Sequence, residues 1–517
     1  MKKIFDVFIL MCFVFCIAAV PAYANASQEL SSDDATEIKQ TVQEFFEAYL
    51  ENAYLYTNND FTQQTVISKE TAQNAKSTFV IDGENKSLAD LCDNISYIRD
   101  KVAYWQYMRK DAGIERTDFK TEFSFDSVNI NNNTANVKLA AYMSFQYADS
   151  DLPSYMEAIY SATLVKLDNR WLIADVTEAN DWFDATYKND DSFDVDRIIR
   201  DYEAEKASSS EGGLDYEAAS VSRVGTSLSY NQANAAAYAY TYTTSTSATP
   251  TDFYNNNFQY FSSDCMNFAS QCVWAGFGGS NDVTSINNHG VPMDATGSYN
   301  WFSSKTQNDH SASWSSCSSF RTYASNSNSA TSETGLRTTK YSLGSTDSFS
   351  VVTNYSTVLL GAVLHVPGSS GDYGHAVIVT DVTGSSRSNV YYCAHTNMAK
   401  NIKISDSWNT GKIYVYIPTS FYSSTTLSSP RISVDMYRPV AQNTTQTLTA
   451  TTDVSCYRIA TTVTTPGGSS STSNTYNASS ATRSYTFSST GLYTIKVSAY
   501  LTSSSSAVDH YYTIRVY

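Results

Sequence analysis

The sequence is poor in charged residues and in histidine. Only 16% of its 517 residues are Asp, Glu, Lys or Arg, and it has six histidines. Basic residues form no patch, which argues against nucleic acid as a partner. Ligand pairs with the short spacing of zinc sites, such as H-x-x-x-H or C-x-x-C, are absent. We therefore expect neither a metal nor another cofactor.

Long apolar runs are also missing, except at the N-terminus. Residues 8–20 form an apolar run that follows two lysines. Small residues come after it at alternating positions: Ala22, Ala24 and Ala26. This pattern is typical of a secretory signal peptide, here residues 1–26, because the apolar core is short for a membrane anchor. We expect a secreted protein, extracellular or associated with the cell wall, without membrane contact after signal cleavage.

The length of the chain corresponds to about three domains. The formal net charge is −17, and nearly all of the excess acid lies before about residue 218. In residues 28–205, helical spacing of apolar side chains from Ile38 to Ala53 is followed by segments that alternate apolar and polar residues. This α+β pattern resembles the NTF2-like cone, for which we expect a binding or spacer role.

The rest of the chain divides into a linker and two further units. Residues 206–221 are rich in Glu, Ser and Gly and are expected to form a linker. Residues 222–422 contain most of the histidines. Residues 428–517 alternate in short segments between Gly, Ser and Asn turns, which resembles an all-β sandwich of the Ig-like or PKD-like kind. The predicted fold class is thus multidomain, and we expect a monomer.

The cysteines raise the choice between a disulfide framework and a reactive thiol. Six remain after the signal: Cys92, Cys265, Cys272, Cys317, Cys393 and Cys456. An even number in an exported chain suggests disulfides, but the first and last of these fall in different predicted units. Cys265 and Cys272, with Phe268 and Ala269 between them, have the i, i+3, i+4, i+7 spacing of a buried helix face. Such a helix separates the two by about 10 Å, beyond the limit of about 7 Å between Cα atoms for a bridge.

A helix that begins at Cys265 provides the environment of a nucleophile. Asp264 is a suitable N-cap residue, and the unpaired N–H groups and the dipole of the first turn favour an anion. A thiolate at that position has a depressed pKa. The same N–H groups can stabilise an oxyanion. A nucleophile of this kind also needs a base, commonly a histidine.

Three histidines lie in or beside short β-like runs. His375, in GDYGHAVIVTDV, is best placed as the base because it begins a predicted buried strand behind a glycine turn. His365 lies in GAVLHVPG and His395 in VYYCAHTN. For any one histidine alone, a structural role is more common than catalysis. The other three are expected at the surface: His289, His310 and His510.

The segment DCMNFASQCVWAGFGG resembles the D-C-x-N-F-x-S-Q motif of the putative amidase domain family, a papain-like group related in plan to NlpC-type and CHAP cell-wall cysteine peptidases. SYNQANAAAYAYTYT resembles the helix that precedes this motif, and GHAVIVTDV and YYCAHTNMAKN resemble the histidine strand and the strand after it. The resemblance extends from Ser227 to about Phe421. It implies a central papain-like α+β domain with cysteine amidase or peptidase activity.

The resemblance also implies roles for individual residues. Cys265 would be the nucleophile and His375 the general base. His395 would orient the imidazole of His375, with Asn397 as the alternative. His365 is a substitute base if the intervening hairpin turns near residue 370 and places it across from His375. Three further residues match the motif and are expected to cap or pack the helix: Asp264, Asn267 and Gln271.

Two hypotheses of different classes follow. The first is an exported hydrolase that forms an acyl-enzyme and cleaves amide bonds in peptidoglycan or another extracellular peptide. The second is a non-catalytic surface or adhesion protein with a degenerate papain-like scaffold, which the Ser/Thr/Tyr-rich flanks suit. The retained Cys265, His375 and His395 favour the enzyme. A zinc site made of Cys265 and the three strand histidines is disfavoured by their long spacing.

Overall fold

The structure is a computed structural model. It describes residues 32–57, 65–67, 78–81, 84–179, 181–190, 193–208, 226–243, 254–295, 300–306, 308–326, 334–368, 374–409, 411–423 and 426–517. The predicted signal peptide and most of the predicted linker lie outside the described residues.

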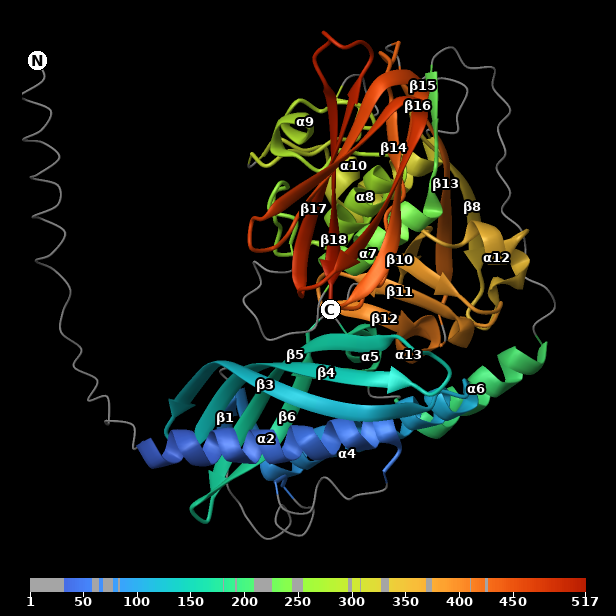
Figure 1. Ribbon diagram of the computed structural model, residues 1–517. Coiled ribbons are helices and arrows are strands. Elements are labelled where there is room, and N and C mark those ends of the chain that lie inside the picture. Colours follow the sequence, from blue (N-terminus) through green and yellow to red (C-terminus); the bar gives the residue numbers. More distant parts are fainter. Residues whose placement is uncertain are drawn as a thin grey trace, which may run out of the picture.

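The N-terminal segment packs helices against an antiparallel sheet (Figure 1). Its elements are α2 (Ser32–Leu55), β1 (Thr78–Ile81), β2 (Glu84–Ser87), α4 (Leu88–Asp111), β3 (Arg116–Asn131), β4 (Thr134–Tyr147), β5 (Pro153–Leu167), β6 (Arg170–Glu178), α5 (Trp182–Tyr187) and α6 (Val195–Ser208). The apolar face of α2, from Ile38 to Ala53, is buried against the sheet as its helical spacing predicts. Helix α4 was not among the predicted elements, although Leu91, Ile95, Ile98 and Val102 carry the same spacing.

The central segment has helices on both faces of its strands. Its elements are β7 (Thr226–Ser229), α7 (Gln232–Tyr242), α8 (Cys265–Gly276), α9 (Val283–Asn287), α10 (Ala312–Ser315), α11 (Cys317–Asn326), β8 (Gly335–Leu343), α12 (Tyr355–Val358), β9 (Val363–Val366), β10 (His375–Val382), β11 (Val390–Ala394), β12 (Ala399–Lys403), α13 (Ile404–Trp408) and β13 (Ile413–Ser423). Every residue of α8 is buried, and its polar side chains Asn267, Ser270 and Gln271 are hydrogen-bonded, as buried polar groups usually are.

The pairing of strands continues from the N-terminal segment into the central one. Strand β5 pairs with β12, with Met156 opposite Ala399. One sheet therefore runs in the order β3-β4-β5-β12-β11-β10-β9-β13-β7. This pairing brings the start of β5 and the end of β6 close to the loop that follows β11 and to α13.

The C-terminal segment forms a five-stranded antiparallel sheet. Its strands are β14 (Ile432–Val434), β15 (Thr444–Thr464), β16 (Ser470–Phe487), β17 (Gly491–Tyr500) and β18 (Val508–Val516). The sheet docks on α7, where Nε of Arg515 donates to the carbonyl of Thr241 at 2.8 Å. The all-β character agrees with the sequence pattern, while the likeness to an Ig-like or PKD-like sandwich stays a prediction. His510, expected at the surface, is buried on β18, and burial lowers its pKa to about 4.

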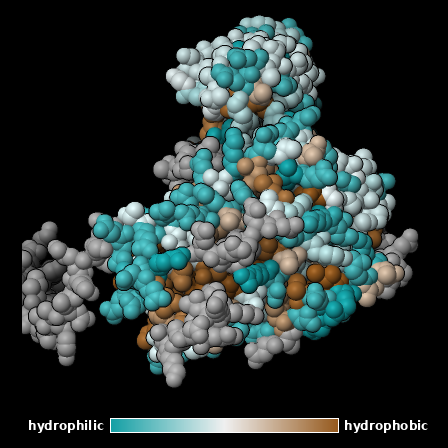
Figure 2. All heavy atoms as spheres, turned by 90° about the horizontal axis from the view of Figure 1, so that it is seen from below, coloured by the Kyte–Doolittle hydropathy of each residue, from teal (hydrophilic) through white to brown (hydrophobic). Residues whose placement is uncertain are grey.

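No helix among the described residues is long and apolar enough to cross a membrane. The face drawn in Figure 2 mixes hydrophilic and hydrophobic residues.

Candidate active site

Helix α8 begins at Cys265, as the sequence predicts. The first hydrogen bond within the helix runs from the N–H of Phe268 to the carbonyl of Asp264 at 2.9 Å. The N–H groups of Cys265, Met266 and Asn267 precede it, as at any helix N-terminus. The thiol of Cys265 therefore lies at the positive end of the helix dipole.

Asp264 holds this helix start, though not as a capping side chain. Its carboxylate makes no cap hydrogen bond; Oδ1 accepts from Nδ2 of Asn267 at 2.7 Å, and Oδ2 lies 2.7 Å from Nδ1 of His395. Its own N–H donates to Oγ1 of Thr396, also at 2.7 Å. Asp264 thus ties the residue before the thiol to the segment that follows β11.

The surroundings of Cys265 favour its thiolate. The pKa of this thiol is held well below its ordinary value, chiefly by hydrogen bonding from Cys317, whose sulfur lies 3.8 Å away. Burial opposes the shift, because Cys265 is only 4% exposed. Hydrogen bonding and positive charge from His375 and the N–H of Ala376 lower the pKa further. A thiolate stabilised in this way is the reactive form of cysteine.

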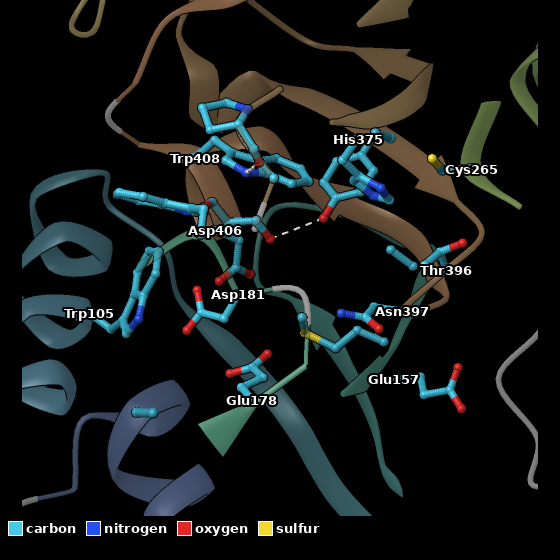
Figure 3. A pocket seen from close by; sticks show the side chains of 18 of the residues that line it. Trp105, Glu157, Glu178, Asp181, Cys265, His375, Thr396, Asn397, Asp406 and Trp408 are labelled. Atoms are coloured by element: carbon cyan, nitrogen blue, oxygen red, sulfur yellow. Dashed lines mark hydrogen bonds between the residues drawn. The ribbon is translucent and has the colours of Figure 1, made fainter. Parts of the chain in front are cut away.

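His375 begins β10, immediately after Gly374, and is half-buried. It lines the same pocket as Cys265, and Figure 3 shows the two side chains facing that pocket from different elements. The ring of Trp408 lies 5.8 Å from the imidazole, centre to centre. The indole Nε1 of Trp408 donates to the carbonyl of Pro367 at 3.1 Å, which fixes the ring.

His395 does not contact His375, contrary to the role that the resemblance implies. Its Nδ1 faces Asp264, and its Nε2 donates to the carbonyl of Tyr242 at 2.8 Å. Its ring stacks on Phe268 at 3.8 Å. The strand register explains the difference. Ile378 of β10 pairs with Cys393 of β11 in antiparallel fashion, so the same register, continued by two residues, places His395 opposite Ala376. His375 and His395 therefore point to opposite faces of the sheet.

His365 is also misplaced for the role of a substitute base. It pairs with Ala376 across β9 and β10 rather than with His375, and the offset of one residue puts the two rings on opposite faces. Its side chain is fully buried against Phe320 and Tyr416. Burial lowers its pKa to about 3, and within the described structure neither ring nitrogen has a hydrogen-bond partner.

The remaining predicted residues make structural contacts. Asn397 lines the pocket, and its Nδ2 donates to the carbonyl of Ala179 at 2.8 Å. Oδ1 of Asn267 accepts from Nε1 of Trp314 at 2.8 Å. Oε1 of Gln271 accepts from the hydroxyl of Tyr238 at 2.7 Å. The last two contacts hold α8 against its neighbours.

The pocket at Cys265 and His375 encloses about 1150 Å³, including solvent space at its mouth. Much of its wall comes from the N-terminal segment, which sequence reasoning did not connect with the site. The residues contributed by that segment are Tyr49, Ala53, Tyr54, Trp105, Arg109, Met156, Glu157, Tyr160, Glu178, Asp181 and Trp182. Burial, with the nearby charge of Asp181, raises the pKa of Glu178 to about 8. In the described part of the chain, no group of three or more His, Cys, Asp or Glu side chains is placed to hold a metal ion.

The lowered pKa of Cys265 predicts an unusual pH profile for its alkylation. Below its pKa an ordinary thiol loses about tenfold in rate per pH unit, because only the thiolate reacts. We expect the rate of Cys265 with iodoacetamide in the folded protein to fall far less steeply between about pH 9 and about pH 6 than that of an ordinary thiol. Peptide mapping after short exposures measures it, and the same protein in guanidinium serves as the control, in which the steep profile should return. A steep profile in the folded protein would contradict a stabilised thiolate.

The comparisons with known proteins concern two parts of this architecture. A family model described as a putative amidase domain matches residues 229–418, which confirms the amidase-domain resemblance at that level and indicates hydrolase activity. A search of curated proteins finds no match. Solved structures that match include a protein from Kribbella flavida (12% identity, 28% of this chain and 90% of that chain, TM-score 0.18). An NTF2-like protein from Salmonella enterica also matches (12% identity, 28% of this chain and 92% of that chain, TM-score 0.17). So does an NTF2-like protein from Cytophaga hutchinsonii (12% identity, 29% of this chain and 98% of that chain, TM-score 0.16). TM-scores this low support no conclusion about this chain.

Proposed function

We propose that the protein is a papain-like cysteine amidase or peptidase in which Cys265 is the nucleophile and His375 the general base. The observation that carries this proposal is the thiol of Cys265 at the N-terminus of α8, with a lowered pKa and His375 in the same pocket. The match of the amidase-domain model to the segment that contains both residues supports it.

The chemistry follows from this geometry. The thiolate of Cys265 attacks the amide carbonyl, and the N–H groups at the start of α8 are suitable donors for the oxyanion that forms. His375, protonated at that stage, gives its proton to the leaving amine as the C–N bond breaks. The remaining thioester is then attacked by water, which loses a proton to His375. Breakdown of this second intermediate releases the carboxylic acid and regenerates the thiolate.

The contacts of His375 favour a dyad that is positioned by packing. His395 has both ring nitrogens engaged with Asp264 and Tyr242, so neither is available to His375. Trp408, whose ring is fixed by Pro367, lies against the imidazole instead. We assign Trp408 as a positioning residue, and His395 as the residue that anchors Asp264 beside the nucleophile.

The proposed substrate is an amide bond in a peptide of the bacterial cell wall or another extracellular peptide. The signal-like N-terminus supports an exported location. The pocket supports an extended substrate, because its walls combine aromatic rings such as Trp105 and Trp182 with carboxylates such as Glu157. In this proposal the N-terminal segment binds substrate as well as packing against the amidase domain.

Digestion of purified cell wall tests the proposal. Wild-type protein is expected to release peptides or amino compounds that mass spectrometry identifies, each cleavage leaving a new carboxyl end on one fragment and a new amino end on the other. The Cys265→Ala variant is expected to release none. If neither protein releases products from cell wall or from a general peptide library, while both bind cell wall equally, the chain is an adhesion scaffold and the proposal fails.

A further inference from the structure

A second cysteine lies beside the proposed nucleophile, although 52 residues separate them in the sequence. The sulfurs of Cys265 and Cys317 are 3.8 Å apart, and both residues are free thiols in this structure. Each thiol also approaches the carbonyl oxygen of Gly374, at 3.9 and 3.6 Å respectively. The two residues begin different helices, α8 and α11. Each thiol therefore lies at a helix N-terminus, and both approach the same carbonyl oxygen.

We propose that Cys265 and Cys317 form a reversible disulfide that switches off the proposed amidase site. A disulfide requires the sulfurs to approach to about 2.0 Å, a shift of roughly 1.8 Å from their present separation. Cys265 opens into the pocket, and Cys317 is partly exposed, so a small oxidant reaches the pair from solvent. The switching role rests on the proposed function, whereas the disulfide itself does not.

The oxidation balances with hydrogen peroxide as the oxidant. The thiolate of Cys265 attacks one peroxide oxygen, the O–O bond breaks, and the products are a sulfenic acid and hydroxide. The sulfur of Cys317 then attacks the sulfenic sulfur, so the S–S bond forms and the S–O bond breaks. The proton of Cys317 and the departing hydroxide leave as water. The two sulfurs together lose two electrons, and a dithiol reductant returns them.

The electrostatics of the pair favour this order of steps. Hydrogen bonding to Cys265, burial and the negative charge of Cys265 all raise the pKa of Cys317. Cys317 therefore keeps its proton while Cys265 is a thiolate. A sulfenic acid at Cys265 is neutral, so its formation removes the negative charge that holds this proton. Cys317 becomes a better nucleophile only after Cys265 has been oxidised.

The test oxidises the full-length protein with hydrogen peroxide at about one equivalent and reads mass and activity. Wild type is expected to lose the mass of two hydrogen atoms and to give one linked peptide pair that contains Cys265 and Cys317. Its hydrolytic activity should fall roughly tenfold or more and return on treatment with dithiothreitol. The peptide with Cys272, a buried thiol on the same helix whose pKa burial raises, is the internal control and should stay unmodified.

The variants Cys317→Ser and Cys317→Ala make the test decisive. The variants and wild type are also treated with a several-fold excess of hydrogen peroxide. Without the second thiol, the sulfenic acid of Cys265 is expected to react with a second equivalent of peroxide to give a sulfinic acid and water, and dithiothreitol should then not restore activity. Activity is expressed as a fraction of the starting value of each protein, so that a change in basal rate does not matter. The proposal would be overturned if dithiothreitol restored the activity of a Cys317 variant as fully as that of wild type. It would also be overturned if oxidised wild type gave no linked peptide pair. If no protein hydrolyses any substrate, the mass still decides whether the disulfide forms.

Discussion

Replacing Cys265 with alanine is expected to lower kcat for amide hydrolysis by at least ~10⁴-fold, because a nucleophile and its base act as a unit and loss of either removes covalent catalysis. The expectation depends on the lowered pKa of this thiol and on His375 in the same pocket. Steady-state hydrolysis of a peptide identified in the cell-wall digest measures it. The thermal unfolding temperature shows whether the variant is folded.

The matched control is Cys272→Ala, the same substitution two turns further along α8. Cys272 is fully buried, so this variant loses packing and some stability. Its kcat is nevertheless expected to stay within about tenfold of wild type, since the thiol is remote from the pocket. A Cys265→Ala protein that hydrolyses the peptide as fast as Cys272→Ala would show that another group is the nucleophile.

The largest effect on stability is expected from Asp406→Asn. Asp406 is fully buried on α13 and joins the central segment to the N-terminal one. Its Oδ1 pairs with Nε of Arg109 at 2.9 Å and with Arg116, and its Oδ2 accepts from the hydroxyl of Tyr147 at 2.6 Å. Loss of its charge leaves two buried guanidinium groups without a carboxylate. Removal of one partner from a buried ion pair typically costs about 3–5 kcal/mol in the free energy of unfolding.

The stability difference between wild type and Asp406→Asn is expected to decrease at low pH. Burial acts to raise the pKa of Asp406, but the positive charges of Arg116 and Arg109 outweigh it and leave the pKa lowered. The carboxylate therefore stabilises the folded state above its unfolded pKa of about 3.9, and this contribution is lost as the pH falls through the lower folded value. The difference between wild type and Asp406→Asn in urea denaturation should be constant near neutral pH and shrink in strong acid.

Asp149→Asn is the comparison for a partly exposed ion pair across the same junction. Asp149 lies 2.7 Å from Nζ of Lys403; the side chain of Asp149 is 55% exposed, whereas that of Lys403 is 3% exposed. Because water reaches the carboxylate, Asp149→Asn is expected to lose less stability than Asp406→Asn. If the two variants lose the same small amount of stability, the buried cluster around Asp406 does not hold the segments together.

The sequence by itself determined the features that depend on local spacing. The helix that begins at Cys265, the apolar face of α2 and the strand that begins at His375 all follow from periodicity within a few turns or residues. The choice of Cys265 as candidate nucleophile needed only its position after Asp264 and the match of its neighbours to a motif. These patterns are visible because helix and strand geometry relate residues that are close in sequence.

Tertiary structure alone decided which side chains meet at that thiol. The one-residue register between β9, β10 and β11 turned His365 and His395 away from His375. The packing of α11 brought Cys317 to Cys265, and the pairing of β5 with β12 placed the N-terminal segment in the pocket wall. Each of these contacts joins residues far apart in the chain. Local periodicity does not specify strand register or the docking of distant elements. Both depend on which arrangement buries the apolar faces of entire sheets and helices, and these faces are built from residues far apart in the sequence.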